Sequence, residues 1–401
     1  MSGIEASSPE LKPGDWRAAG GNAQTASDAV QQFAVDLYGE IEGLEGNVAF
    51  SPYSIMSCLA LALEGAEGDT YSEMARAMKL IPRSRNLSPS LALLNSAMQA
   101  PQKQDNAGWT VDMANGLFPQ EKYALQNEYV ETIRKFYRAA LQEMDYVNKA
   151  NAAAGKINEW VEKMTRGKIE KLIQPSALNA QTRLVLVNAI YFYGEWMDPF
   201  SDKATKEEAF YVNANKTVEA PLMMRMGNYY YMENKLLQAI ELPYKGNVLS
   251  MVLILPKEKG GLDKVEQALS VSLLKEIYKG LWQTRVMVYV PHFKARSRMQ
   301  LVDVLKRLGM DKAFSMDADF SKMTGKPDLF ISAVMHEAVV EVDEKGAEAA
   351  AATGVVMATK AVGPRVEKPI TFRADHPFLY VIRHRETGAI LFMGRITNPV
   401  E

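Results

Sequence analysis

The feature that most constrains this fold is a run of alanines between two glycines, Gly346 and Gly354. Alanine favours helix, but the glycines leave room for only about two turns, and Val355 and Val356 then favour strand. An unassigned loop of about twenty residues in a compact domain is usually functional or disordered. Residues 349–359 carry no charge, which argues against disorder. We interpret the stretch as a segment that occupies two structural settings.

A strand is expected immediately before the alanine run, over the largely apolar residues 331–343. If the run itself becomes extended, Ala347, Ala349, Ala351 and Thr353 point to one face. Side chains this small could enter a sheet without a clash. The alanine run could therefore follow the preceding strand as a further strand of the same sheet.

These residues resemble the reactive-loop hinge of the serpin superfamily, which reads Glu-x-Gly-Thr-Glu-Ala and continues with small residues. Glu344, Gly346 and Glu348 match this pattern, while Ala347 stands where threonine is usual. The resemblance covers nearly the whole chain, because further motifs occur in the family's order. They lie at residues 47–55, 158–161, 165–169, 184–196, 290–293, 308–310, 376–379 and 392–399.

The resemblance implies an α+β fold, in which about nine helices pack on three mainly antiparallel β-sheets. One serpin-like domain would span residues 1–401, with residues 1–25 as a flexible N-terminal extension and 346–366 as an exposed reactive-centre loop. Hydrophobic periodicity independently predicts a helix over 27–41, a helix from Pro52 and a buried strand over 182–192. Thr70 and Glu73 have the spacing of a capping box that would begin another helix.

The family's counting places the bond that a target protease cleaves fourteen positions after the hinge glycine. That rule gives Lys360–Ala361 here. A lysine suits a specificity pocket with an acidic base, so trypsin-like serine proteases are the implied partners. Arg365 is the competing residue, with Met357 behind it, and a lysine taken alone would be only a solvated side chain. The implied hinge comprises Glu344, Gly346, Ala347, Glu348, Ala349, Ala350, Ala351, Ala352 and Thr353.

Two further clusters follow from the resemblance, and neither is catalytic. The shutter, a polar cluster beneath the point where two central strands part, would contain Ser51, Ser54, Asn188 and His336. The breach, at the top of the same sheet, would contain Gly194 and Trp196. The residues alone leave simpler interpretations open, because His336 could be an ordinary core histidine and Trp196 an ordinary core side chain.

Composition limits partners and compartments. The chain has 46 basic and 48 acidic residues, so neither nucleic acid nor a membrane surface is expected to bind it. Cys58, the one cysteine, forms no internal disulfide and is expected to be a buried structural thiol. No apolar leader precedes residue 25, which favours a cytoplasmic or unconventionally secreted protein, or an extracellular one if Met1 is not the natural start. Glycosylation triplets at Asn86 and Asn215 do not settle the compartment.

The sequence lacks a nucleophile elbow, a phosphate-binding loop, a dinucleotide glycine pattern and zinc-ligand spacing, so we expect no enzyme activity, metal or cofactor. Residues 87–104, where some family members bind heparin, carry only Lys103 as a cation, and we expect neither heparin activation nor an oligomer. Two functions remain. The favoured one is suicide inhibition of serine proteases, and the other is a non-inhibitory carrier or chaperone, which should show bulky, charged or proline residues in its hinge.

Overall fold

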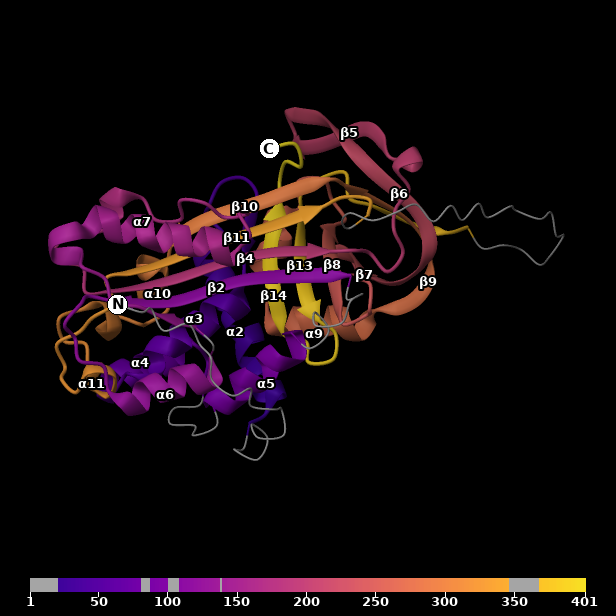
Figure 1. Cartoon of the computed structure of the whole chain (residues 1–401). Coiled ribbons are helices and arrows are strands. Elements are labelled where there is room, and N and C mark those ends of the chain that lie inside the picture. Colours follow the sequence, from indigo (N-terminus) through magenta and orange to yellow (C-terminus); the bar gives the residue numbers. More distant parts are fainter. Residues whose placement is uncertain (1–20, 81–86, 100–107, 138, 346–367) are drawn as a thin grey trace.

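Two β-sheets and the helices packed against them form the fold (Figure 1). The computed structural model describes residues 21–80, 87–99, 108–137, 139–345 and 368–401. The α+β class predicted from the sequence is confirmed. The helices of the described residues are α2 (Ala23–Ile41), α3 (Pro52–Glu64), α4 (Gly68–Ala77), α5 (Leu87–Gln99), α6 (Asn127–Phe136), α7 (Tyr146–Met164), α8 (Leu262–Ala268), α9 (Val271–Gly280), α10 (Val302–Arg307) and α11 (Ser321–Thr324).

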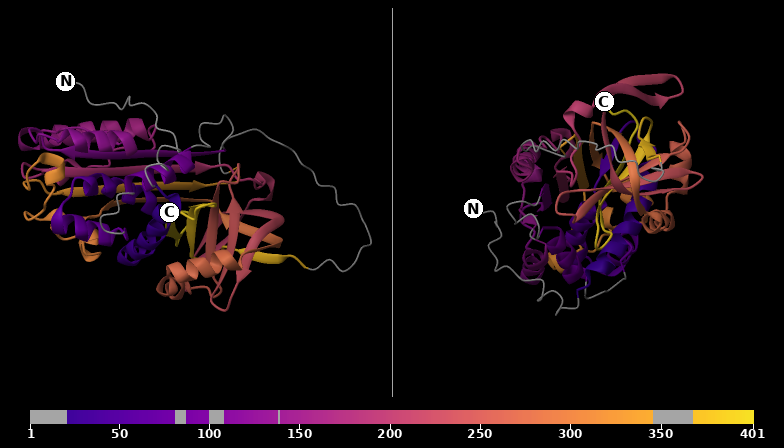
Figure 2. Two further views of the ribbon diagram at one scale, coloured as in Figure 1. Left: turned by 90° about the horizontal axis from the view of Figure 1, so that it is seen from below. Right: turned by 90° about the vertical axis from the view of Figure 1, so that its right-hand side faces the viewer.

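A five-stranded sheet forms the centre of the molecule. Its order is β10 (Phe293–Gln300), β11 (Ala333–Val342), β4 (Leu184–Gly194), β2 (Trp109–Pro119) and β3 (Ala140–Leu141). Alternate residues of β4 face opposite ways, so that Leu186 and Ile190 join the core on the side of α3 and Val185 and Val187 join the core under α7. Helices α3 and α7 therefore cover opposite faces of this sheet (Figures 1 and 2).

The second hydrogen-bonded network has nine strands. They are β1 (Val48–Phe50), β14 (Ile390–Ile396), β13 (Phe378–His384), β8 (Leu249–Pro256), β7 (Leu237–Pro243), β6 (Lys216–Glu233), β9 (Trp282–Pro291) and β12 (Ile370–Arg373), with β5 (Lys206–Asn213) paired to β6. The family resemblance implies three sheets, but β6 is 18 residues long and pairs with β5, β7 and β9. This shared strand joins two of the expected sheets into one network.

Two predicted helix starts are displaced. The 27–41 helix begins at Ala23, because the side chain of Asn22 accepts from the amides of Gln24 and Thr25. The predicted capping box is wrong, since α4 begins at Gly68 and makes no side-chain cap. Thr70 and Glu73 instead accept from the backbone N–H groups of Asp319 and Lys312 at 2.9 and 2.7 Å, so they bind a distant segment. No helix of the described residues is long and apolar enough to cross a bilayer.

Candidate functional site

The central feature of the site is the border between β4 and β11, which we call the seam. The two strands are parallel neighbours, paired from Val185 opposite Ala333 to Phe192 opposite Val340. The chain leaves β11 at Val342 and is described as far as Lys345. The remaining predicted hinge residues, from Gly346 to Thr353, lie outside the described residues, as do Met357, Lys360, Ala361 and Arg365.

His336 and Asn188 meet on the buried face of the seam that points toward α3. They are direct partners in the β11–β4 register, and Nδ1 of His336 lies 2.5 Å from Oδ1 of Asn188. The backbone N–H of Ser51 donates to Nε2 of the same ring at 3.3 Å. Nε2 therefore carries no proton, and the neutral ring donates from Nδ1. All three residues are at most 1% exposed.

The start of α3 supplies the rest of this cluster. Pro52 occupies the first turn, and Oγ of Ser51 caps it by accepting from the N–H of Ser54 at 3.1 Å. Asn188 donates from Nδ2 to Oγ of Ser54. The structure thus brings together all four residues predicted for the shutter. Burial lowers the pKa of His336 to about 3, because a charged ring would lose its hydration in this cluster.

Asn115 also belongs to the cluster, and sequence reasoning missed it. It lies on β2 directly opposite Asn188, and Nδ2 of Asn188 donates to its Oδ1. Polar side chains on β11, β4 and β2 consequently form one row across three strands. An asparagine in a strand of mixed apolar and polar residues was only a weak signal, and the strand register is what connects it to Asn188.

The predicted breach residues lie at the far end of β4. The indole Nε1 of Trp196 donates to the carbonyl of Asp343 at 2.9 Å, and its backbone N–H donates to the carbonyl of Lys345 at 3.2 Å. The indole stacks on Tyr244, with ring centroids 4.6 Å apart. At Gly194 a Cβ atom would lie 2.6 Å from Cδ1 of Tyr244, so close packing requires glycine there.

Glu344, the first hinge residue, is held by contacts from three segments. Its carbonyl accepts from the N–H of Phe200 at 2.8 Å, and its Oε1 accepts from Oγ1 of Thr205 at 2.5 Å. Its Oε2 lies 2.6 Å from Nε2 of His292, which separates β9 from β10. These contacts fix the point at which the chain leaves the seam. Neither Thr205 nor His292 could be recognised as a partner of Glu344 from the residue pattern.

Cys58 faces the buried side of β4. Its Sγ donates to the carbonyl of Val187 at 3.4 Å, and burial raises the pKa of the thiol to about 12. The thiol is therefore unreactive at neutral pH, as expected of a structural cysteine. Across the described ranges, no three His, Cys, Asp or Glu side chains are placed to hold a metal ion.

A family model described as serpin, serine protease inhibitor, matches residues 28–399. The chain is a serpin. An uncharacterized serpin-like protein of Thermococcus kodakarensis is 40% identical, over 94% of this chain and 87% of that protein. Bovine leukocyte elastase inhibitor is 37% identical, over 93% of this chain and 99% of its own.

Solved serpin structures have the same fold. Human thyroxine-binding globulin, complexed with thyroxine, is 28% identical with a TM-score of 0.84, covering 94% of this chain and 100% of that one. The serpins that resemble this chain thus include a named protease inhibitor and a named hormone-binding protein. Membership of the family supports proteases as partners in general.

Proposed function

We propose that this serpin inhibits trypsin-like serine proteases by a suicide mechanism. The observation that carries the proposal is the parallel pairing of β4 and β11. A chain that leaves the end of β11 and turns back would run antiparallel to both strands, so the seam can accept it as an added strand with good hydrogen bonds on each side. The alanine-rich residues after Lys345 have the small side chains that such a strand needs.

The proposed reaction begins at Lys360. The serine hydroxyl of the protease attacks the Lys360 carbonyl, the Lys360–Ala361 bond breaks, and the amine of Ala361 leaves, so that Lys360 is held as an ester. The hinge then inserts into the seam before water hydrolyses that ester. Fourteen inserted residues would carry the protease roughly 46 Å. The protein would be consumed as a substrate and would perform no catalysis of its own.

Three features support a loop that inserts into the seam rather than one that stays outside it. Glu344 is anchored at the top of the seam, so the segment that follows starts beside its proposed position. The His336 cluster lies beneath the seam and has donors and acceptors that can form new hydrogen bonds when the strands part. Between Ala347 and Ala352, Glu348 is the one residue that is not alanine, and the family hinge shares it.

A carrier function is the second candidate, favoured by the likeness to thyroxine-binding globulin. The hinge composition argues against it, because residues 347–352 contain no proline and no bulky side chain that would obstruct insertion.

Incubation with a panel of trypsin-like proteases, followed by denaturing electrophoresis, tests the proposal. We expect a denaturant-stable complex with at least one protease, and the variant Lys360→Glu as a matched control should form none. Clean cleavage of the parent without any complex would favour the carrier function.

A further inference from the structure

The loop that follows α7, residues 165–173, lies across the seam on the face opposite His336. We call it the α7 return loop. Its apolar residues Ile169, Leu172 and Ile173 are buried against side chains of both β4 and β11, including Val187 and Val339. The loop therefore covers the line along which the two strands would have to separate.

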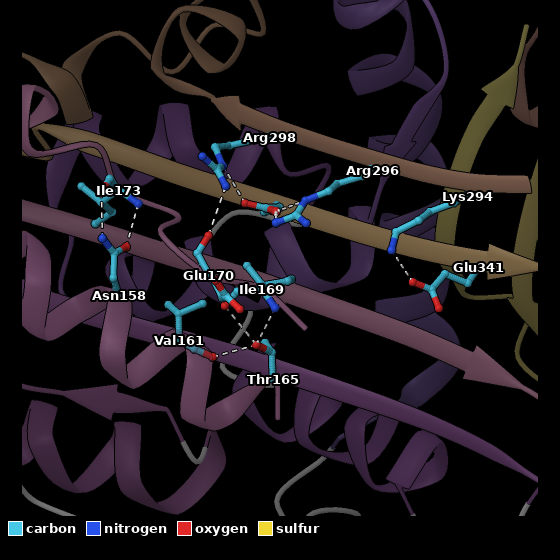
Figure 3. Close-up of polar contacts among 11 residues, drawn as sticks. Asn158, Val161, Thr165, Ile169, Glu170, Ile173, Lys294, Arg296, Arg298 and Glu341 are labelled. Atoms are coloured by element: carbon cyan, nitrogen blue, oxygen red, sulfur yellow. Dashed lines mark hydrogen bonds and ion pairs between the residues drawn. The ribbon is translucent and has the colours of Figure 1, made fainter. Parts of the chain in front are cut away.

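Hydrogen bonds attach the α7 return loop to helix α7 (Figure 3). Oγ1 of Thr165 donates to the carbonyl of Val161 at 2.9 Å and accepts from the N–H of Ile169 at 3.1 Å. The amide of Asn158 on α7 bonds both the N–H and the carbonyl of Ile173, each at 2.8 Å. Because these bonds close the loop onto the helix, the loop and α7 should move as one body.

One part of the α7 return loop is fixed to the β2 and β4 side of the seam. The guanidinium of Arg166 forks onto Asp112 of β2, with Nε to Oδ2 at 2.8 Å and Nη2 to Oδ1 at 2.5 Å. Nζ of Lys168 lies 4.8 Å from the ring centroid of Tyr191 on β4. These contacts do not cross the seam, so opening it leaves them intact.

The other side holds the loop through Arg298 on β10. Nη2 of Arg298 donates to the carbonyl of Glu170 at 3.2 Å (Figure 3). Its Nε donates at 2.6 Å to Oε2 of Glu337 on β11, a carboxylate with no exposed surface. Arg296 donates from Nε to Oε1 of the same carboxylate at 2.6 Å. A buried carboxylate needs such partners, and this one holds Arg298 where it reaches Glu170.

We propose that Arg298, positioned by Glu337, latches the α7 return loop across the seam and thereby slows its opening, an inference that rests on the proposed insertion mechanism. Glu337 joins β10 to β11, while Arg166 joins the loop to β2. When β11 moves away from β4, the contact between Arg298 and Glu170 must break. The hydroxyl of Tyr191 on β4, which lies 3.4 Å from Oε2 of Glu341 on β11, crosses the seam in the same way.

The variant Arg298→Lys tests the latch. Lysine keeps the positive charge beside Glu337 but lacks the fork that reaches Glu170 at the same time. The readout is the uptake rate of a synthetic peptide with the sequence of residues 346–359, followed by native electrophoresis and by the rise in melting temperature, without any protease. In the parent, the charge-assisted hydrogen bond between Arg298 and Glu170 must break as the seam opens. The variant lacks this bond, so its uptake should be roughly tenfold faster.

A matched variant separates the latch from general loosening. Arg296→Lys weakens the hydrogen bonding of the same buried Glu337 carboxylate and leaves the bond between Arg298 and Glu170 in place. It should take up the peptide at the parent's rate. If Arg298→Lys does not fold, Arg298→Gln must still accelerate uptake, because its shorter side chain cannot bind Glu337 and Glu170 together.

The outcomes distinguish this inference from the proposed function. Uptake by the parent, with equal rates for Arg298→Lys and Arg296→Lys, overturns the latch and leaves the insertion mechanism standing. Failure of Arg298→Gln to accelerate uptake, where Arg298→Lys does not fold, overturns it equally. No uptake of peptide by the parent overturns the insertion mechanism itself.

Discussion

Acid should lower the free energy of unfolding through His336. The size of the effect follows from the burial of this side chain. Burial lowers the pKa of the ring to about 3, against 6.5 for an exposed histidine. The folded state therefore excludes a proton that the unfolded chain binds. Stability from the neutral ring is fully present above pH 6.5 and is lost as the pH falls towards 3. At pH 5 the loss is about 2 kcal/mol, from about 1.5 pH units at 1.36 kcal/mol each.

Replacing His336 by glutamine should remove this pH dependence. A glutamine amide is neutral throughout and has both a donor and an acceptor for Asn188 and Ser51. We expect the free energy of the first unfolding transition in urea to fall between pH 7.5 and pH 5.0 by about 2 kcal/mol less in His336→Gln than in the parent.

The control variant is His292→Gln. Its histidine lies beside Glu344 and is partly exposed, so it should leave the contribution of His336 unchanged. The comparison uses differences between two pH values, so a constant cost of either substitution cancels. Equal acid dependence in the parent and His336→Gln would refute the reasoning, because the ring would then not be the buried neutral group described above.

Four further outcomes are expected. Lys360→Glu should abolish inhibition without lowering the melting temperature; retained inhibition would indicate that the protease cleaves after Arg365 instead. Cleavage near Lys360 should raise the melting temperature by adding a strand, and a nicked sample that melts no higher would contradict insertion. Ala347→Arg should be cleaved normally yet trap little protease, because a buried unpaired guanidinium is costly; parental stoichiometry would refute this. Gly194→Ala should cost about 1–3 kcal/mol in urea unfolding, since its Cβ would crowd Tyr244, and unchanged stability would refute that packing.

Local chemistry made part of the fold predictable. The apolar run that became β4 is buried along nearly its whole length, and Pro52 begins α3 as expected from its missing N–H. The four shutter residues were named from the family resemblance, and the structure places them in contact with one another. Periodicity alone would have left His336 as one more core residue.

Features decided by tertiary contacts could not be predicted. Thr70 and Glu73 have the right spacing for a capping box, but two distant backbone amides compete for the same oxygens and bind them. Strand β10 was missed because its polar and charged residues, among them Arg296 and Arg298, give only a weak strand signal. Its pairing with β11 determines the strand. Asn115 was missed for a related reason, since only register places it opposite Asn188.

The position of β10 at the edge of the central sheet also affects how readily the protein aggregates at high concentration. Strand β10 is the last strand on its side of the central sheet, so one row of its backbone groups pairs with no other described strand. Lys294, Arg296 and Arg298 occupy alternate positions along it, and Lys294 pairs with Glu341 at 2.6 Å. A foreign strand would have to desolvate this row of charges. Edge-to-edge aggregation is thereby opposed while the sheet keeps an unpaired border.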